Sequence, residues 1–563
     1  RQRYNGMVNL PVVQDRSALR IVGFYRDEDG WVDNLGTGIE NSNELVDWGG
    51  RAIWLTDVTD RLSVRLLASY EKSDPEDSGL INPDRGEFIR FSDRPDRFLG
   101  ELTNYNATVK YDFDWADFTS SSTWTTYDQL FYVDLAGTFG QAIPFALDAD
   151  AYDDIFVQEM RLVSEGGGNW DWVIGGFYFD KTRTVDYNYR SSQEFLDARG
   201  LTGLPDEYYS VSSSYADIKE IAGFGELTYR FSDSFWLTGG LRYGSTEVQA
   251  FQKDGGYTSN YLLAALLGFS NIPLTVTPVT AVDGEPAKEK GPSYKFSASY
   301  KPVDEMTFYA TYATGFRTPS RNARAGQASL VDPTDIIIPE GADSDDLKSY
   351  EVGVKGSWAD GKVNANLAAY YIDWSNIQVQ ANRVSDQVQF ATNIGQAVSK
   401  GIEWELGLLP TDNLYFGFNG AWNQAEVTEL SDEEAAISGA VEGWQLSGPE
   451  WSMNASARYT FFLPQGAEGW VSGTASYVDE FPGMFPNVPG QPGVQTPTFG
   501  YTDAWTSVNA QVGIEKNDWQ VIGYVENLFD DNSITYVHPE AFIDGRFARL
   551  RPRTIGVRVG YGL

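Results

Sequence analysis

YKFSASYKPVDEMTFYATYATGFRTP, residues Tyr294–Pro319, shows the pattern that the rest of this chain repeats. Side chains on a strand point alternately to two faces, so a strand with one apolar face has an apolar residue at every second position. Both halves of the stretch follow this rule, with Tyr294, Phe296, Ala298, Tyr300, Phe308, Ala310 and Tyr312 on one face. The polar break at Pro302–Glu305 makes the two strands a hairpin. Tyrosines favour a membrane–water interface, so the hairpin predicts two strands of a transmembrane barrel.

The composition of the chain agrees with this prediction. The 563 residues contain no cysteine, 14% aromatic residues and 56 glycines, which suit strands, aromatic girdles and turns. The mean hydropathy is −0.35 and no apolar run reaches about 18 residues, which excludes helical membrane spans. A spanning strand needs only about 9–11 residues with every second one apolar, so a barrel stays possible. The net charge of −37 argues against nucleic acid as a partner.

Short turns alternate with long loops along the whole chain. Short turns on one rim and long loops on the other are typical of outer-membrane barrels, with the short turns in the periplasm. Long connections are predicted at 186–215, 252–290, 318–346, 429–447 and 479–503. The predicted short turns are 13–16, 57–60, 112–115, 166–171, 232–234, 302–305, 359–361, 410–413, 464–468 and 516–518.

These turns predict about 21 strands. Bacterial single-chain barrels have even strand numbers, and about 22 is typical of plugged transporters, so we expect one further strand upstream of Arg1. A miscounted hairpin is the alternative explanation. The chain begins Arg1-Gln2-Arg3-Tyr4, without an initiator Met or an apolar leader segment, which favours a processed or truncated product.

Several short motifs resemble the TonB-dependent receptors of Gram-negative outer membranes. Each motif is weak alone, but their order and spacing are specific. They are Asn9-Leu-Pro11 leading into Ala18-Leu-Arg20, Asp29-Gly-Trp-Val-Asp-Asn34, Phe308-Tyr-Ala-Thr-Tyr-Ala-Thr-Gly-Phe-Arg-Thr-Pro319, Lys348-Ser-Tyr-Glu-Val-Gly353, Asn393-Ile-Gly395 with Gly401-Ile-Glu403, Glu526-Asn-Leu-Phe-Asp530 and Arg551-Pro-Arg-Thr554.

The resemblance implies a barrel of about 22 antiparallel strands in the outer membrane, closed by an N-terminal plug. Residues 1–563 are then the barrel domain, and the plug, its TonB box and the first strand lie upstream. The implied partners are outer-membrane lipid and lipopolysaccharide, a small-molecule ligand, and the inner-membrane TonB complex that pulls on the plug. No nucleic acid and no cofactor are expected. The usual terminal aromatic is displaced, because Gly562 and Leu563 follow Tyr561.

Enzyme and metal chemistry have little support in the sequence. The only histidine, His538, follows Ser533 by five residues, but no third group is placed to orient the pair, so we predict no enzyme. Acidic segments such as Asp27–Asp29 carry the oxygen ligands that Ca²⁺ prefers. They lack the order of an EF-hand loop, and linkage to lipopolysaccharide through divalent ions is an equally plain role. We therefore predict no metal site.

Ligand capture is the predicted role of the long loops. Aromatic faces stack on catechols or sugar rings, and arginine forks grip carboxylates. Girdle aromatics and wall arginines paired with acids are the alternative interpretation. The candidates are Tyr309 on the lumen face and Phe316, Arg317, Arg321, Arg324, Trp444, Phe485, Tyr501 and Arg546 near the outer rim, with Arg317 at the ligand's entrance.

The function predicted from these observations is TonB-dependent uptake of a scarce ligand, with a ferric siderophore as the first hypothesis. The acidic exterior would repel an anionic chelate, although ionic screening limits this effect to about 8–10 Å. An oligosaccharide, a cobalamin-like molecule or an aromatic compound therefore stays open as the ligand. A passive porin or a structural barrel is the alternative from a different class.

Overall fold

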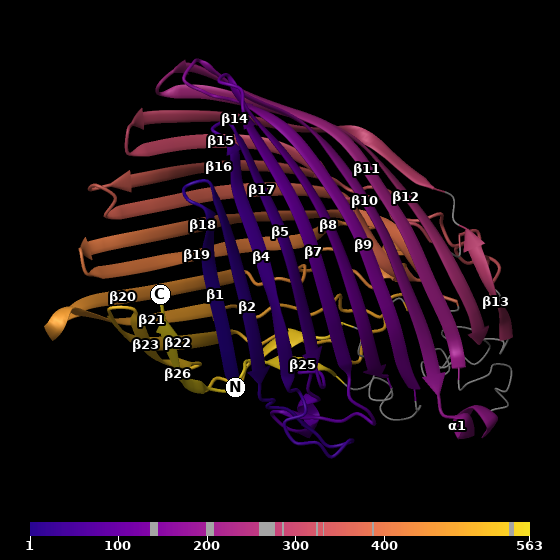
Figure 1. The fold of residues 1–563 in the computed structure, drawn as a ribbon. Coiled ribbons are helices and arrows are strands. Elements are labelled where there is room, and N and C mark those ends of the chain that lie inside the picture. The colour runs from indigo at the N-terminus through magenta and orange to yellow at the C-terminus, as the bar shows by residue number, and fades with distance from the viewer. Residues whose placement is uncertain are drawn as a thin grey trace.

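Alternating side chains and short polar turns produce one large antiparallel sheet in the computed structural model, and the sheet curls into a barrel (Figure 1). Every neighbouring pair of wall strands is antiparallel and consecutive in the chain, as expected when tight turns join successive strands. The structure describes residues 1–135, 145–198, 208–257, 276–283, 286–322, 325–329, 332–385, 388–491, 493–539 and 545–562. The candidate Arg324 lies outside these residues.

The barrel wall contains 21 strands, as the turn pattern predicts. Two segments, β13 and β14, pair with successive parts of β12 and form one interrupted strand, so the 22 segments of the sheet make 21 wall strands. The segments are β1 (Gln2–Val13), β2 (Ser17–Glu28), β4 (Leu45–Thr59), β5 (Leu62–Pro75), β7 (Arg97–Asp112), β8 (Ala116–Asp134), β9 (Phe145–Ser164), β10 (Trp170–Ser191), β11 (Tyr208–Ser232), β12 (Phe235–Tyr257), β13 (Val276–Asp283), β14 (Ala287–Val303), β15 (Met306–Phe316), β16 (Asp346–Trp358), β17 (Val363–Asn382), β18 (Gln389–Thr411), β19 (Leu414–Glu429), β20 (Trp451–Leu463), β21 (Ala467–Val478), β22 (Trp505–Lys516), β23 (Trp519–Glu526) and β26 (Thr554–Tyr561).

Small elements lie outside the wall, in the loops and turns. Two short ladders pair β3 (Asp33–Asn34) with β6 (Ile89–Arg90) and β24 (Ile534–Val537) with β25 (Phe547–Arg549). Among the residues that the structure describes, the helical pieces are α1 (Gln193–Ala198), α3 (Asp432–Ser438) and the 3₁₀ turns Pro83–Arg85 and Pro464–Gly466. In the part of the chain that the structure describes, no helix has the length and apolar character needed to cross a membrane.

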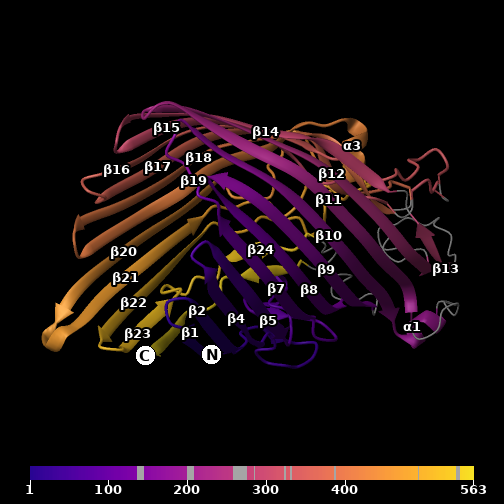
Figure 2. The same ribbon diagram turned by 45° about the horizontal axis from the view of Figure 1, so that its top comes forward.

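The two rims of the barrel differ as predicted. All ten predicted short turns lie between consecutive wall strands at one rim, and the long loops leave the other rim, which we call the outer rim. The strands also differ in length, from 25 residues in β11 to 8 in β26. Since about 9–11 residues span a bilayer, the strands around β8–β12 project well beyond the apolar band. Figures 1 and 2 show these long strands in the wall.

The two faces of the hairpin β14–β15 point as predicted. Phe296 and Tyr300 of β14 are 56% and 51% exposed on the outside of the barrel. On the opposite face, the hydroxyl groups of Ser297 and Thr311 lie 3.0 Å apart across the strands. An apolar outer face and a polar inner face are the arrangement of a transmembrane barrel, so the inner row that contains Tyr309 faces the lumen.

The sheet has a seam between its first and last strands. Among the described residues, β1 pairs only with β2 and β26 pairs only with β23. Both edge strands run from the outer rim to the short-turn rim, since the wall between them has an odd number of strands. At the outer rim the two edges are joined by ion pairs, since Arg1 donates to Glu526 at the end of β23 at 2.8 Å and Arg551, before β26, pairs with Glu28 of β2. The edges are therefore close together but point the same way.

Two clusters of packed apolar residues lie at the outer ends of β17 and β18 and in the loops that cover them. One cluster joins Ile338 of the loop between β15 and β16 to Val388, Phe390 and Ile437. A second cluster contains Ile377, Ile394, Ala397 and Ala440. Helix α3 thus packs against the outer ends of β17 and β18, and the loops on this side form an ordered cap.

Candidate functional site

Tyr309 lies on the lumen face of β15, and its ring is held on three sides. A Cβ atom on Gly353 of the neighbouring strand would lie 2.6 Å from the ring, so only glycine permits this close approach. The phenol donates a hydrogen bond to Glu351 Oε1 at 2.5 Å, and Lys355 Nζ lies 5.4 Å from the ring centroid. The lumen wall therefore presents a fixed phenol beside the carboxylate of Glu351 and the ammonium group of Lys355.

Arg317 follows β15 at the outer rim and is bound to a buried carboxylate. Its backbone N–H and its Nε donate to Asp345 at 2.8 and 2.5 Å, and its guanidinium lies 4.8 Å from the ring centroid of Trp374. The indole of Trp374 donates to the same carboxylate at 2.7 Å, and Asp345 is 1% exposed. Phe316 lies opposite Asp346 at the strand end. The pairing of Arg317 with Asp345 matches the alternative interpretation of the sequence, in which a wall arginine pairs with an acid. Half of the Arg317 side chain is still exposed.

Arg321 has a weaker set of contacts than Arg317. One Nη donates to the carbonyl oxygen of Pro286 at 3.5 Å, close to the limit of a hydrogen bond. Its Nε is buried and has no hydrogen-bond partner among the described residues. Of the two arginines, Arg321 has the guanidinium with more hydrogen-bonding capacity left for a ligand.

The aromatic candidates of the later loops divide into two groups. Trp444 and Tyr501 both pack edge-on against Phe499, with ring centroids 5.7 and 5.5 Å apart, respectively. Tyr501 remains 42% exposed, so this group presents an aromatic face to solvent. Phe485 instead packs against the apolar cluster around Ile394. The structure thus brings Trp444 and Tyr501 together and places Phe485 in the packing of the cap.

Arg546 is buried in a network of charges that joins distant loops. Its Nη1 lies 3.3 Å from Asp96 Oδ2, and its other terminal nitrogen donates to the carbonyl oxygen of Asp134. Arg90 pairs with the same Asp96 at 2.8 Å and with Asp77 at 2.9 Å. Arg546 is 7% exposed and the other three charged residues of this network are 2–3% exposed. With the amide of Asn34, which donates to Asp77 at 2.9 Å, these contacts fix the loops after β2, β5 and β23 to one another.

An acidic pocket near α3 was not predicted from the sequence. Its volume is about 440 Å³, and Glu429, Glu434 and Glu442 line it together with Ser375 and Gln396. Ser375 belongs to the same outward row of β17 as the exposed Tyr371, so the pocket lies outside the lumen. The spacing Ser431-x-x-Glu434 is a capping box, a signal that could have revealed the helix.

Hydrogen bonds hold the carboxylate of Glu434 in place. Burial by itself raises its pKa, but the Ser431 N–H and hydroxyl, at 2.8 and 2.7 Å, and the Gly395 N–H, at 3.0 Å, outweigh burial. Together they hold the pKa of Glu434 below its ordinary value. Among the described residues, no group of three or more His, Cys, Asp and Glu side chains could hold a metal ion.

The Ser533–His538 pair does not have the geometry of a nucleophile and its base. The hydroxyl of Ser533 donates to Asp531 Oδ1 at 2.5 Å. A serine nucleophile needs its hydroxyl to donate to the base that will take its proton. The arrangement around Ser533 is instead that of a polar turn, since the Ser533 N–H also donates to Asp531 at 2.9 Å.

Glu28 forms a charge cluster that spans the seam, a second feature that the sequence did not predict. It ends β2 at the outer rim, where its carboxylate accepts from Arg3 of β1 and from Arg551, which precedes β26. The Nε of Arg1 lies 3.2 Å from Glu28, and Arg1 also donates to Glu526 at the end of β23 at 2.8 Å. Burial would raise the pKa of Glu28, but the arginines outweigh it and lower the pKa to about 2.

We expect Glu28→Gln to destabilise the barrel by about 3 kcal/mol at neutral pH, because a shift of one pKa unit corresponds to about 1.4 kcal/mol. A lowered pKa stabilises the fold above the ordinary carboxyl value, and this stabilisation is lost as the pH falls from about 4.5 to about 2. Urea unfolding at pH 7 and pH 3 measures the effect. The difference between wild type and variant should shrink at pH 3, whereas the exposed Glu40→Gln should match wild type at both. An equal difference at both pH values would contradict the assignment.

A family model and individual known proteins match this chain and agree with one another. The family model described as TonB dependent receptor-like, beta-barrel matches residues 31–528. The Rhizobactin receptor of Rhizobium meliloti (strain 1021) is 24% identical over 260 residues, which cover 44% of this chain and 32% of the relative. The Pesticin receptor of Yersinia pestis is 23% identical over 384 residues, which cover 68% and 47%. The chain thus spans a third to a half of the length of these curated relatives.

Solved structures share the fold over nearly the whole chain. The ferric yersiniabactin uptake receptor of Yersinia pestis has a TM-score of 0.78 at 16% identity and covers 99% of this chain and 77% of its own. The siderophore receptor of Acinetobacter baumannii has a TM-score of 0.71 at 15% identity and covers 100% and 79%. At these identities the likeness concerns the fold alone.

Proposed function

Since this chain belongs to the TonB dependent receptor-like β-barrel family, we propose that it is the barrel of an active-transport receptor that takes a ferric siderophore across the outer membrane. The family consists of outer-membrane barrels of Gram-negative bacteria, so the apolar outer face of the wall lies in lipid. The ligand class is supported by the descriptions of the similar proteins, which include a ferric yersiniabactin uptake receptor and a Ferric-pyoverdine 358 receptor. The ferric siderophores named for these similar proteins are the observation on which the proposal rests.

The lumen is the proposed path of the ligand. A wall of about 22 strands encloses a lumen wide enough to need a plug, so a siderophore has room to pass. Tyr309 would contact the ligand inside the lumen, beside Glu351 and Lys355. At the outer rim, Tyr501 would offer its exposed aromatic face for capture, and Arg321 would offer a guanidinium that has few hydrogen bonds to the rest of the protein. Arg317, Phe316, Trp444, Phe485 and Arg546 would shape the loops that present these two residues.

The seam supports a proposal about the rest of the protein. We propose that one further strand, from the part of the protein before Arg1, fills the space between β1 and β26. Those two strands run in the same direction, so a strand between them can be antiparallel to both. An open edge inside a bilayer leaves N–H and C=O groups without partners, at a cost of several kcal/mol each. A plug that precedes this strand, pulled by the TonB complex, would close and open the lumen.

Uptake of radioactive iron tests the proposed function. A strain that lacks the gene should lose uptake of the ferric siderophore, and the full-length gene should restore it only while the protonmotive force is intact. Uptake of an oligosaccharide, a cobalamin-like molecule or an aromatic compound, without any ferric chelate, would reject the siderophore.

Arg321→Ala and Tyr501→Ala should each weaken binding about tenfold, or about 1.4 kcal/mol. Tyr294→Ala is the matched control, because Tyr294 is equally exposed but on the outer face of the wall.

Conductance distinguishes the proposal from a passive porin. The full-length product in a planar bilayer should show little current, because the plug fills the lumen. A large ohmic conductance from the full-length product would reject gated transport in favour of passive diffusion. Removal of the plug by deletion should then open the pore, and this result confirms that the silent protein was inserted.

A further inference from the structure

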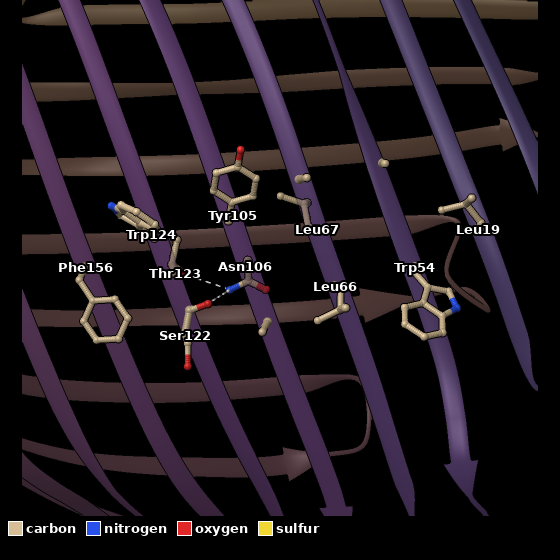
Figure 3. A pocket seen from close by; sticks show the side chains of 13 residues that line it. Leu19, Trp54, Leu66, Leu67, Tyr105, Asn106, Ser122, Thr123, Trp124 and Phe156 are labelled. Atoms are coloured by element: carbon tan, nitrogen blue, oxygen red, sulfur yellow. Dashed lines mark hydrogen bonds between the residues drawn. The ribbon is translucent and has the colours of Figure 1, made fainter.

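The outer face of the wall has a hollow across strands β2, β4, β5, β7, β8 and β9 (Figure 3). The hollow has a volume of about 470 Å³ and an almost wholly apolar lining. Its large walls are Trp54 and Leu66 on one side and Tyr105, Trp124 and Phe156 on the other. Each of these five side chains is 38–53% exposed, so the hollow opens outward to the lipid and not into the lumen.

Two neighbouring rows of outward side chains create this hollow, because one row has small residues where the other has large ones. In the row nearer the outer rim, Ala52 and Ala68 are cross-strand neighbours, and Tyr105 follows Ala68 on the next strand. In the row below, Trp54 pairs with Leu66, and Leu66 pairs with Ala107. Small side chains of one row thus lie beside large ones of the other. The result is a bent groove with an alanine floor and aromatic walls.

The groove lies just below the level where the wall becomes polar. Trp124 donates from its indole N–H to Asp154 at 2.7 Å, and both residues face outward. Slightly farther out, Tyr70 donates to Glu101 at 3.1 Å, and Lys72 pairs with the same carboxylate at 2.7 Å. Aromatic rings with a hydrogen-bonded polar end mark the membrane–water interface. The groove is therefore at the depth of the acyl chains of the outer leaflet.

We propose that this groove is a binding site for one acyl chain of an outer-leaflet lipid. The groove is continuous with the apolar band of the outer face, which lies in the bilayer in barrels of this family. Lipid therefore already covers the wall around the groove. The hydrophobic effect does not favour an acyl chain in the groove over one in the surrounding bilayer, because lipid tails are as apolar as the groove. Selection comes from dispersion contacts: a chain that bends into the groove gains partner atoms on three sides, whereas a chain that passes over it leaves a void.

Photo-crosslinking tests the site in the full chain, refolded into vesicles that contain a phospholipid with a diazirine on its acyl chain. Labelling of peptides from β5 and β7 should saturate as the probe fraction rises, because a site can fill. Ala68→Leu with Ala107→Leu fills the groove and should reduce this labelling about tenfold. Ala310→Leu is the matched control, since Ala310 is an exposed alanine of the outward row of β15 that does not line the groove. Heat-modifiable gel mobility checks that all variants fold.

Two results would overturn the proposal. Labelling that rises in proportion to the probe and does not respond to the filling variant would mean ordinary bulk lipid. The chain contains no cysteine, so Ala68→Cys provides a single thiol. A disulfide-linked dimer of this variant in native membranes would place a second copy of the chain in the groove instead of lipid. A monomer with saturable labelling supports the acyl-chain site.

Discussion

Arg90→Met should loosen the outer loops near the seam by about 4 kcal/mol, the largest effect that we expect from a single substitution. Arg90 is 3% exposed and pairs with Asp77 and Asp96, which are 3% and 2% exposed. Removal of one partner of a buried ion pair costs about 3–5 kcal/mol, because the remaining charge stays buried without compensation. Asp96 keeps Arg546 at 3.3 Å, so Asp77 is the carboxylate that loses its cation.

Hydrogen exchange of the loop amides measures this effect in the folded barrel. About 4 kcal/mol corresponds to faster exchange by a factor of about 10³ in the segments that the network joins, around residues 33–43 and 77–96. Arg85→Met is the control, because Arg85 is an exposed arginine of the same loop. Asp77→Asn combined with Arg90→Met removes both charges of the pair and should recover about half of the loss. Unchanged exchange in Arg90→Met would contradict a structural role for the network.

Asp345→Ala should release the loop between β15 and β16 at a cost of about 3 kcal/mol. Three donors lose their shared acceptor: the backbone N–H and Nε of Arg317 and the indole N–H of Trp374. The cost lies at the low end of the range for broken buried pairs, because the Arg317 side chain is half exposed and can turn to water. The exposed Asp343→Ala provides the control two residues away in the same loop.

A double-mutant cycle of Arg317→Ala and Asp345→Ala decides what Arg317 does. If Arg317 mainly holds the loop, the two substitutions remove the same interaction, and a coupling of about 1–3 kcal/mol appears in the exchange of loop amides. If Arg317 instead serves the ligand, loop exchange in the two single variants should add without coupling. The sequence places Arg317 at the entrance of the ligand, and this role stays a prediction until the cycle is measured.

The wall of this barrel could be predicted almost completely from the sequence. The alternation from Tyr294 to Tyr312 identified the strands, their lipid and lumen faces, and the turn that joins them, where Val303 pairs with Met306. Such a prediction works because a strand has a side-chain period of two, and a slip of one residue would turn its apolar face to the lumen. The ten short turns and the 21 strands followed from the same pattern.

The candidate site was much less accessible to sequence reasoning. Exposed aromatics and arginines in the long loops look alike in a sequence, but the structure gives them different surroundings. Tyr501 remains exposed, whereas Arg546 is buried among carboxylates. Glu28 appeared in an acidic segment that could have suggested a cation site, but three arginines neutralise its surroundings. Loops have no side-chain period, so their partners cannot be inferred from spacing.

The wall and the family of this protein could be inferred from the sequence alone, because strand periodicity and tight turns are local properties of the chain. The tertiary structure decided the outer cap, the charge cluster at the seam and the lipid-facing groove. Arg317 meets Asp345 over 28 residues, and Arg546 meets Asp96 over 450 residues. The first contact needs only the pairing of the adjacent strands β15 and β16. The second arises only when the sheet curls and brings its first and last strands together, because the curvature of the whole wall sets which distant loops become neighbours.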